Sequence, residues 1–413
     1  MSNSESHSSP LRVQDREVAA WLQREDRRQQ NTLTLIASEN HCSAAVREAC
    51  GSRITDKYAE GYPNRRYYAG CEVADGIEEL ARHRALQLFQ GAEDVNVQPH
   101  SGTTANLEAL LALAGPGGRI VGMALKAGGH LSHGHDRSHT GMVFAARQYG
   151  VDATGRIDLD QVRDLVREHR PKVLIAGGSS YSRNIDYAAF ASIAQEVGAY
   201  LMADIAHPAG LMAAGVVPGP VGIADVVTMT THKTLRGPRG GMILAKKTVS
   251  KLINSSVFPG SQGGPLVHQI AAKAVAFGEA LRPEFRTYQQ KVKENAAHLA
   301  ECLVAKGLDI VTGGTDNHIV LVDLRKVEMT GAAVEERALA AGLAVNKNAI
   351  PGDPRPPMVT SGLRLGTAAV TTRGLGRDEI AKIADLVGAI VRGEDPDRLR
   401  PTVQGLCEAF PLP

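Results

Sequence analysis

Short apolar segments that alternate with amphipathic stretches constrain the fold of this 413-residue chain more than any other feature. The apolar segments lie at residues 118–123, 172–176, 199–203, 225–229 and 242–245. Stretches 159–166 and 190–197 repeat apolar residues at helical spacing, as does an earlier stripe formed by Val73, Ile77, Leu80 and Leu88. Buried strands that alternate with helices are typical of a mostly parallel sheet with helices on both faces. The sequence therefore predicts an α/β domain.

The C-terminal third has a different pattern, which predicts a second, smaller domain of the α+β class. Two helical patterns meet at Pro283, which cannot continue a helix, and a strand-like segment and two more helices follow. These five segments span 265–281, 284–306, 317–324, 332–341 and 377–391. We expect a disordered tail over 1–11, an N-terminal arm and large domain over 12–284, and a small C-terminal domain over 285–413.

Composition and charge exclude several classes of function. The 46 Lys and Arg residues exceed the 44 Asp and Glu residues by only two, so no surplus of charge favours nucleic acid or an anionic membrane. No segment approaches the ~20 consecutive apolar residues of a membrane helix, and the polar N-terminus lacks the apolar core of a signal peptide. The five cysteines form no CxxC pair, which disfavours a disulfide scaffold or a zinc module. We expect a cytoplasmic globular protein.

Two polar residues at strand ends indicate the chemistry of a pyridoxal-phosphate enzyme. Lys233 follows the strand of segment 225–240 (DVVTMTTHKTLRGPRG), where loops line clefts in α/β proteins. An amine there can form a Schiff base with the cofactor's aldehyde, whereas the segment alone would also fit a solvated surface lysine. Asp204 ends another strand and is costly to bury without a partner. The cofactor's protonated ring nitrogen is such a partner, and a helix-capping aspartate is the alternative.

Other segments favour the binding of anionic groups. Ser101, Gly102 and Thr103 precede a helix expected to start near Thr104, and a helix N-terminus favours phosphate, although an ordinary N-cap would look alike. The QGGP turn at 262–265 could serve similarly. Arg364 lies on a probable strand (SGLRLGT), where a bound carboxylate or an internal salt bridge would explain its charge. Four histidines in 127–141 lack the cysteine or carboxylate pattern of a metal site, so no metal is expected.

Longer motifs make the chain similar to the serine hydroxymethyltransferase family from about Leu33 to Gly374. They are LIASEN (35–40), KYAEGYP (57–63), NVQPHSG (96–102), THKTLRGPRGG (231–241), GGTDNH (313–318) and TSGLRLGT (360–367). The resemblance implies the fold type I of pyridoxal-phosphate transferases, with a seven-stranded, mostly parallel sheet in the large domain. It also implies an amino-acid substrate, tetrahydrofolate as co-substrate, and a homodimer or tetramer whose active sites are shared between subunits.

The resemblance assigns roles position by position. Lys233 resembles the family's Schiff-base lysine, and Asp204 its pyridinium partner. The other cofactor positions are Ser101, Gly102, Thr103, His130, Ser179, His207 and His232, with Tyr58 and Gly264 from the neighbouring subunit. The substrate positions are Ser38, Tyr68, His207 and Arg364, and the catalytic positions besides Lys233 are Glu60, His130, Thr230 and Tyr68. The folate positions are Glu60, Leu125, Gly129, Leu131 and Asn348.

These roles imply a pyridoxal-phosphate- and tetrahydrofolate-dependent hydroxymethyltransferase that interconverts serine and glycine through a Schiff base between cofactor and amino acid. The chain departs from the family's usual motifs at Asn64, Ala69, Thr103, Thr104, Lys126, Ala127, Met229, Met358 and over 133–139. Because these changes cluster in predicted active-site loops, a specialised α-methylserine/D-alanine hydroxymethyltransferase is an alternative. A folate-independent β-hydroxy amino acid aldolase or transaldolase is another. A non-catalytic homologue is disfavoured by the presence of Lys233, Asp204 and Arg364.

Overall fold

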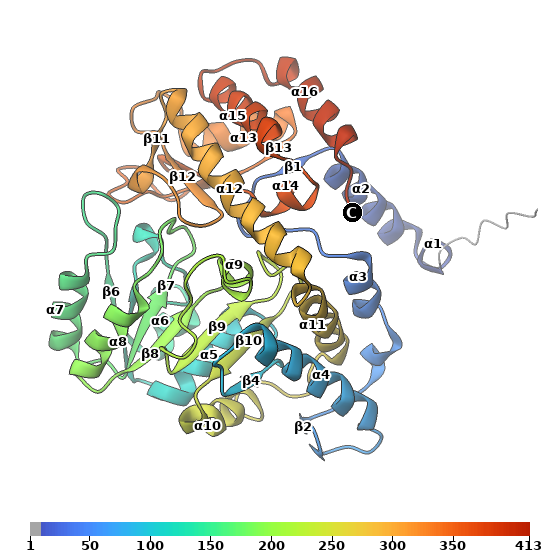
Figure 1. Cartoon of the computed structure of the whole chain (residues 1–413), viewed down its shortest axis with the longest axis vertical. Helices are drawn as coiled ribbons and strands as arrows, with labels where there is room; N and C mark the ends of the chain where they lie inside the picture. The colour runs from blue at the N-terminus through green and yellow to red at the C-terminus, as the bar shows by residue number, and fades with distance from the viewer. Residues whose placement is uncertain (1–9) are drawn as a thin grey trace, which may run out of the picture.

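A seven-stranded sheet with the order β4-β10-β9-β8-β7-β5-β6 forms the centre of the larger unit in the computed structural model, which describes residues 10–413 (Figure 1). The strands are β4 (Asp94–Asn96), β5 (Arg119–Met123), β6 (Ala145–Tyr149), β7 (Val173–Gly177), β8 (Tyr200–Asp204), β9 (Val226–Thr230) and β10 (Gly241–Ala245). Strands β9, β8, β7, β5 and β6 pair in parallel, whereas β10 is antiparallel to both neighbours. The predicted mostly parallel sheet is confirmed, and each predicted apolar segment forms one strand.

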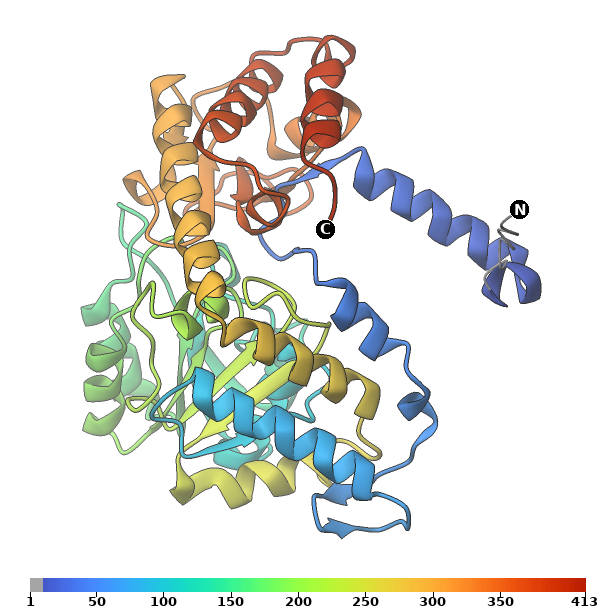
Figure 2. The same ribbon diagram turned by 45° about the vertical axis from the view of Figure 1, so that its right-hand side comes forward.

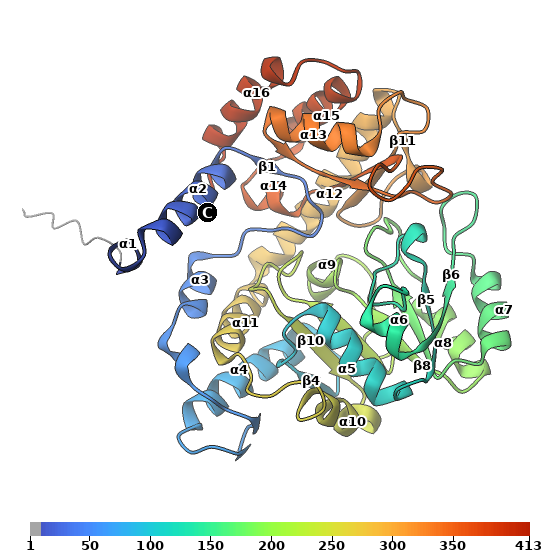
Figure 3. The same ribbon diagram turned by 180° about the vertical axis from the view of Figure 1, so that it is seen from behind.

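Helices cover both faces of this sheet because its central strands are apolar on both sides. Every residue of β7, β9 and β10 is buried. One face packs against α4 (Glu72–Leu88), α7 (Leu159–His169), α8 (Tyr187–Glu196), α9 (Ala209–Ala213) and α11 (Val267–Ala280). The opposite face packs against α5 (Gly102–Ala114), α6 (His139–Val143) and α10 (Lys247–Val257), as the view from behind shows (Figure 3). Helix α5 begins two residues before the predicted start.

The smaller unit contains an antiparallel sheet of four strands in the order β11-β12-β15-β14. Its strands are β11 (Asp309–Ile310), β12 (Ile319–Asp323), β14 (Asn346–Asn348) and β15 (Gly362–Gly366), and its helices are α13 (Gly331–Ala341), α14 (Ala368–Thr372), α15 (Arg377–Val391) and α16 (Pro396–Ala409). Helix α12 (Pro283–Ala305) joins the units, with Phe285 in the larger core and Leu299 in the smaller one. Pro283 starts this helix, because a proline is tolerated in the first turn.

The N-terminal segment contacts both units. Strand β1 (Leu33–Thr34) pairs in parallel with β13 (Leu343–Ala344), and Leu33 and Leu35 are buried in the core of the smaller unit. Helix α3 (Ala44–Cys50) packs through Val46 against α11 of the larger unit. The residues between β1 and α3, which include Ser38, therefore pass across the junction of the two units.

Two helical surfaces of the N-terminal region expose apolar residues that a single chain would be expected to bury. Helices α1 (Pro10–Gln14) and α2 (Arg16–Gln30) project from the body, and α2 buries none of its residues (Figure 2). Helix α4 has the predicted position, but Val73 and Leu80 of its expected apolar stripe are exposed. Its buried face instead includes Glu78, which pairs with an arginine described below. Of the predicted tail, residues 1–9 lie outside the described residues, and Pro10 and Leu11 belong to α1.

Candidate active site

A cavity of about 270 Å³ opens where the carboxyl ends of the parallel strands meet the N-terminus of α5. In an α/β sheet this edge is where ligands bind, because the loops after several strands converge there. Eleven of the residues named by the resemblance line the cavity: Ser38, Ser101, Gly102, Thr103, His130, Ser179, Asp204, His207, Thr230, His232 and Lys233. Segments from residue 38 to residue 233 are thus brought together around one space.

Asp204, the last residue of β8, is a buried carboxylate with three hydrogen-bond donors. Its Oδ2 accepts from Asn106 Nδ2 and His133 Nε2, each at 2.8 Å, and its Oδ1 accepts from the Ala206 amide at 2.9 Å. Burial by itself raises the pKa of Asp204, but the hydrogen bond and charge of His133 outweigh burial and lower the pKa below the usual range. Asp204 is therefore ionised at neutral pH and can hold a protonated nitrogen in the cavity.

Lys233 follows β9 in a loop whose backbone is fixed from three directions. Its carbonyl accepts from Asn40 Nδ2 at 2.9 Å, and the next carbonyl, of Thr234, accepts from Gln289 Nε2 at 2.6 Å. The Thr234 hydroxyl donates to the His207 carbonyl at 2.6 Å. Burial lowers the pKa of Lys233 to about 8, and Asp204 opposes that shift. A substantial neutral fraction of the amine, which is the nucleophilic form, is therefore present near neutral pH.

The N-terminus of α5 forms an anion-binding cradle beside Lys233. The Ser101 hydroxyl caps the helix by accepting from the Thr104 amide at 3.1 Å. Gly102 is required by close packing, because a Cβ there would lie 2.6 Å from Thr230 Cγ2. Nδ1 of the cavity residue His232 is buried and has no hydrogen-bond partner among residues 10–413. The free amides and the unpartnered ring nitrogen favour a phosphate at this point.

Two histidine rings form part of the cavity wall. Burial lowers the pKa of His130 to about 4 and places the pKa of His207 well below its ordinary value. Both rings are therefore neutral at pH 7, which suits His130 to stacking on an aromatic ring. His130 Nδ1 lies 2.7 Å from Ser132 Oγ, and His207 Nε2 lies 3.3 Å from Ser179 Oγ.

Arg364, on β15 of the smaller unit, reaches the cavity wall from the opposite side. Its Nη1 donates to the Ser179 carbonyl at 2.8 Å, and its Nε donates to Asn346 Oδ1 at 3.1 Å. No salt bridge joins it to a carboxylate in the described part of the chain, so the predicted alternative of an internal ion pair is not observed. Its Nη2 has no hydrogen-bond partner among these residues, which leaves that side of the guanidinium for a substrate carboxylate.

The predicted residues of segment 57–72 lie outside the cavity of the single chain. Tyr58 and Tyr68 stack edge to face at 5.1 Å and are 53% and 49% exposed. The Tyr58 hydroxyl donates to Glu60 Oε1 at 3.1 Å, and its ring packs so closely on Gly264 that a Cβ there would lie 2.9 Å from Cε2. Tyr58, Tyr68, Glu60 and Gly264 thus form one cluster, called the exposed cluster for its two tyrosines, while Glu60 and Gly264 are half-buried.

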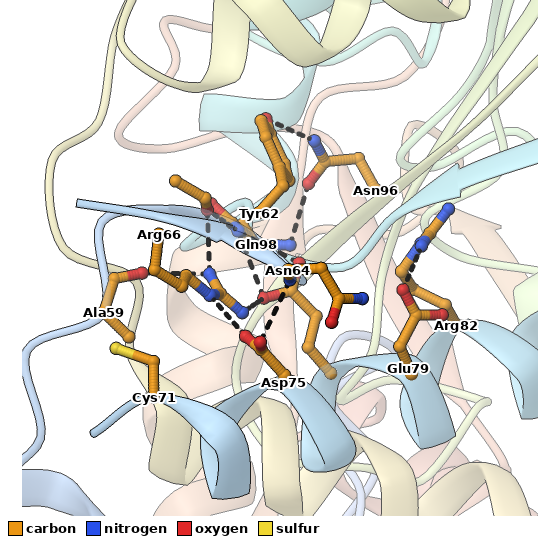
Figure 4. A network of polar contacts seen from close by, with 12 residues as sticks. Ala59, Tyr62, Asn64, Arg66, Cys71, Asp75, Glu79, Arg82, Asn96 and Gln98 are labelled. Atoms are coloured by element: carbon orange, nitrogen blue, oxygen red, sulfur yellow. Dashed lines mark hydrogen bonds and ion pairs between the residues drawn. The ribbon is translucent and has the colours of Figure 1, made fainter. Parts of the chain in front are cut away.

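A buried arginine joins the backbone on both sides of Glu60 to α4, and Figure 4 shows its polar contacts. Arg66, in the hairpin of β2 (Gly61–Tyr62) and β3 (Arg65–Arg66), pairs with Asp75 at 2.8 Å and with Glu78 at 2.7 Å. It also donates to the carbonyls of Ala59 and Gly61. Gln98 donates to Glu78 and to the Gly61 carbonyl, so the network also connects the hairpin to the segment that leads to Ser101.

None of the predicted folate positions lines the cavity, and those in segment 125–131 form a rim beside it. Leu125 and Leu131 expose their side chains, and Asn348 lies in β14 of the smaller unit. Gly129 belongs to the tight turn between Leu125 and Leu131, where a Cβ would lie 2.1 Å from the Met123 carbonyl oxygen. The preceding Gly128 carbonyl accepts from the Ser179 amide at 2.7 Å, which places the rim against the cavity wall.

The sequence patterns did not identify several residues of the site. Glu39, Asn106, Gly178, Ala206 and Arg239 line the cavity, and His133 contacts Asp204 from behind. Asn106 carried a usable signal, because it is a polar residue one turn after Gly102 on a mostly apolar helix. His133 belongs to the histidine-rich segment whose role stayed open.

Most of the residues that depart from the family's motifs lie outside the cavity lining, although His133 contacts Asp204. Met229 is buried in the core of the larger unit, and Thr104 hydrogen-bonds to the Ser101 hydroxyl at 2.9 Å. Met358 and Ala69 are exposed. Of the departures, only Thr103 is among the lining residues. The geometry of the single chain therefore gives no support to the predicted α-methyl preference.

The donor set fits pyridoxal phosphate. The cradle at α5 suits its phosphate, the ionised Asp204 suits its ring nitrogen, and Lys233 supplies the amine for its aldehyde. The unpartnered Nδ1 of His232 is a buried polar atom whose cost a bound phosphate would remove.

Comparison with known proteins agrees with this fit. Residues 11–387 match the family described as serine hydroxymethyltransferase. The chain is also 53% identical over 405 residues to serine hydroxymethyltransferase 1 of Pseudomonas fluorescens (strain Pf0-1). That similarity covers 96% of this chain and 98% of the relative. The family match includes every cavity residue from Ser38 to Arg239.

Proposed function

Because the chain belongs to the serine hydroxymethyltransferase family and interconverts serine and glycine with pyridoxal phosphate and tetrahydrofolate, we propose that the cavity around Lys233 is where this transfer occurs. The observation that carries the proposal is the joint placement of Lys233 and an ionised Asp204 in one cavity beside the N-terminus of α5. Neither a solvated surface lysine nor a capping aspartate would need this arrangement.

Each side chain then has a defined task. The bound cofactor supplies an electron sink for the carbon that bears the amino group. Asp204 keeps the cofactor's ring nitrogen protonated, since its carboxylate is ionised and held by Asn106 and His133. His130 presents a neutral ring for stacking, and Arg364 binds the carboxylate of the amino acid with its open Nη2 edge. Lys233 would hold the cofactor through Nζ and could give or take a proton there.

The folate half of the reaction is assigned to the rim and to the exposed cluster. Leu125 and Leu131 offer apolar surface beside the cavity, which suits a flat heterocycle. Glu60 is the acid and base for the hydroxymethyl oxygen, and Tyr68 contacts the substrate. Because both residues are outside the cavity of their own chain, we propose that they act at the cavity of a second copy.

A homodimer or larger assembly is supported by the exposed surfaces of the N-terminal region. Tyr58, Tyr68 and the apolar residues of α2, among them Trp21, expose much of their surface. We also propose a cytoplasmic location, in agreement with five free cysteines. Within residues 10–413, no helix is both long enough and apolar enough to span a bilayer.

Borohydride reduction of the holoenzyme tests the central assignment. We expect a pyridoxyl group on the peptide that contains Lys233, none in Lys233→Ala, and unchanged labelling in Lys251→Ala, whose lysine is exposed on α10. Label on a different lysine would remove Lys233 from this role and with it the proposed site.

A further inference from the structure

Lys273 of α11 is a fully buried lysine with an unusual set of partners. Its side chain is only 1% exposed. Its Nζ donates to three backbone carbonyls, those of Val97 at 2.6 Å, Pro99 at 3.1 Å and Gly241 at 2.8 Å. Lysines are almost never fully buried unless they are paired with an opposite charge. A function beyond ordinary packing is therefore expected of this residue.

The three carbonyls identify the protonated form of Lys273. An ammonium has three N–H donors, and each of them has one acceptor here. A neutral amine would leave one carbonyl unpaired and direct its lone pair at that oxygen. Burial lowers the pKa of Lys273 to about 7, so the charge is held at a cost that a nearby anion would reduce.

No carboxylate in the described part of the chain forms an ion pair with this ammonium. Glu78 is already bound to Arg66 and Gln98. Burial raises the pKa of Glu108 to about 8, which leaves that group mostly uncharged at neutral pH. Glu108 and Glu78 still favour the charged form of Lys273 from a distance, but neither contacts the ammonium directly.

The carbonyls bound by Lys273 belong to the segment that leads into the phosphate cradle and to the start of the strand that packs against this segment. Val97 and Pro99 follow β4 and lead directly to Ser101, and Gly241 begins β10. The Gly241 amide donates to the Pro99 carbonyl at 3.0 Å, and a Cβ on Gly241 would lie 2.3 Å from the Ser101 carbonyl oxygen. The Gly240 carbonyl accepts from the Thr231 amide, immediately before His232. Lys273 therefore holds the backbone beneath both the α5 cradle and His232.

We propose that Lys273 is a positioning residue for the cofactor's phosphate, which it serves by fixing the backbone of the cradle from below and by supplying a buried positive charge that the bound phosphate balances. This inference rests on the phosphate site proposed above. It assigns to α11, which contributes nothing to the cavity lining, an electrostatic part in cofactor retention.

The test compares the binding of pyridoxal phosphate and of pyridoxal, which lacks the phosphate, to the apoenzyme. Lys273→Met removes the charge and the donors at similar length, and Lys273→Gln removes the charge but keeps an amide donor. The matched control is Asn295→Leu, which removes a buried side chain that donates to the Leu375 carbonyl of the smaller unit. Dissociation constants are measured by absorbance titration at fixed ionic strength.

We expect the wild type and Asn295→Leu to prefer pyridoxal phosphate by the same factor. In Lys273→Met and in Lys273→Gln that preference falls by about tenfold or more, while pyridoxal binding changes little. A preference equal to the wild type's in both variants, or an equal loss for both ligands, would leave Lys273 a packing residue only. A wild type without any preference would instead overturn the phosphate site itself.

A second measurement tests the proposal if the apoenzymes unfold without cofactor. The wild type and Lys273→Met are then dialysed to remove the cofactor, in buffer with and without inorganic phosphate, and their unfolding is followed by circular dichroism. Unfolding that millimolar phosphate prevents in the wild-type apoenzyme but not in Lys273→Met supports the proposal. Equal protection of both proteins by phosphate contradicts it.

Discussion

The cavity around Lys233 and the exposed cluster of Tyr58, Glu60 and Tyr68 are two parts of one proposed site, but they are stabilised differently. In the cavity, the functional groups are held by partners from the same chain, as Asn106 and His133 hold Asp204. In the cluster, Arg66 holds only the backbone next to Glu60, and the side chains of Tyr58 and Tyr68 are about half exposed.

This difference separates what one chain can preorganise from what it cannot. A buried carboxylate or amine acquires a shifted pKa only when its surroundings exclude water, and the cavity provides this within a single chain. Glu60 lies on a hairpin at the surface, where its environment depends on what covers it. One copy therefore holds the residues that line the cavity, while Glu60 and Tyr68, and the cofactor positions Tyr58 and Gly264, are proposed to come from a second copy.

The largest effect is expected from Arg66→Met, which would detach the exposed cluster from α4. This change leaves the buried Glu78 without its cation, and breaking such a pair costs ~3–5 kcal/mol of unfolding free energy. Arg82→Met is the matched control, because its pairs with Glu79 and Asp94 are more exposed and contribute ~1 kcal/mol or less. Urea unfolding of both variants measures the difference. Similar losses would show that the network does not anchor the hairpin.

The pH dependence of cofactor attachment tests the preorganised cavity. A pKa of about 8 in place of 10.5 raises the neutral fraction of the Lys233 amine about 300-fold at pH 7. The rate of covalent attachment of pyridoxal phosphate to the apoenzyme should therefore rise with pH and level off above about pH 8. Stopped-flow absorbance measures it, with N-acetyl-lysine amide as the reference amine. A rise that continues in parallel with the reference would mean that Lys233 is not buried in solution.

Asp204→Asn should reduce kcat/KM for serine by about 100-fold, because a neutral amide cannot hold the proton on the cofactor's ring nitrogen. Asp225→Asn serves as the control, since Asp225 pairs with Lys246 in a partly exposed position outside the cavity. Steady-state kinetics distinguish the two variants. Equal activities would contradict the role of Asp204.

A smaller but diagnostic effect is expected from mixing two inactive variants, Lys233→Ala and Glu60→Gln. If the two parts of the site come from different copies, each mixed dimer has one intact site. Random exchange should then restore roughly a quarter of the wild-type activity. Refolding the variants together, with each alone as reference, provides the measurement. No recovery in a confirmed mixed dimer would place Glu60 at the cavity of its own chain.

Much of the cavity could be predicted from the sequence, because its residues follow strands that the apolar segments identify. Lys233 follows β9, and Asp204 ends β8, so both necessarily lie at the same edge of a parallel sheet. Arg364 was identified because a charge between apolar strand residues requires a partner. Its carboxylate partner is still a proposal.

Other contacts were decided only by the tertiary structure. Val73 and Leu80 read as a core stripe but are exposed, because α4 directs Glu78 inward to Arg66. Strand β1 pairs with a strand of the smaller unit, although in the sequence it comes before the larger unit.

The sequence by itself determined the sheet class, five of the seven strands of the large sheet and the residues at its functional edge, since apolar periodicity and strand ends are local properties. Only the tertiary structure decided which groups hold Asp204 and what Lys273 binds. Asn106, His133 and Lys273 lie 98, 71 and 32 residues from the atoms that they contact on Asp204 and Gly241. The physical reason is that a buried polar group takes its properties from the neighbours that packing brings to it, and no local pattern records those neighbours.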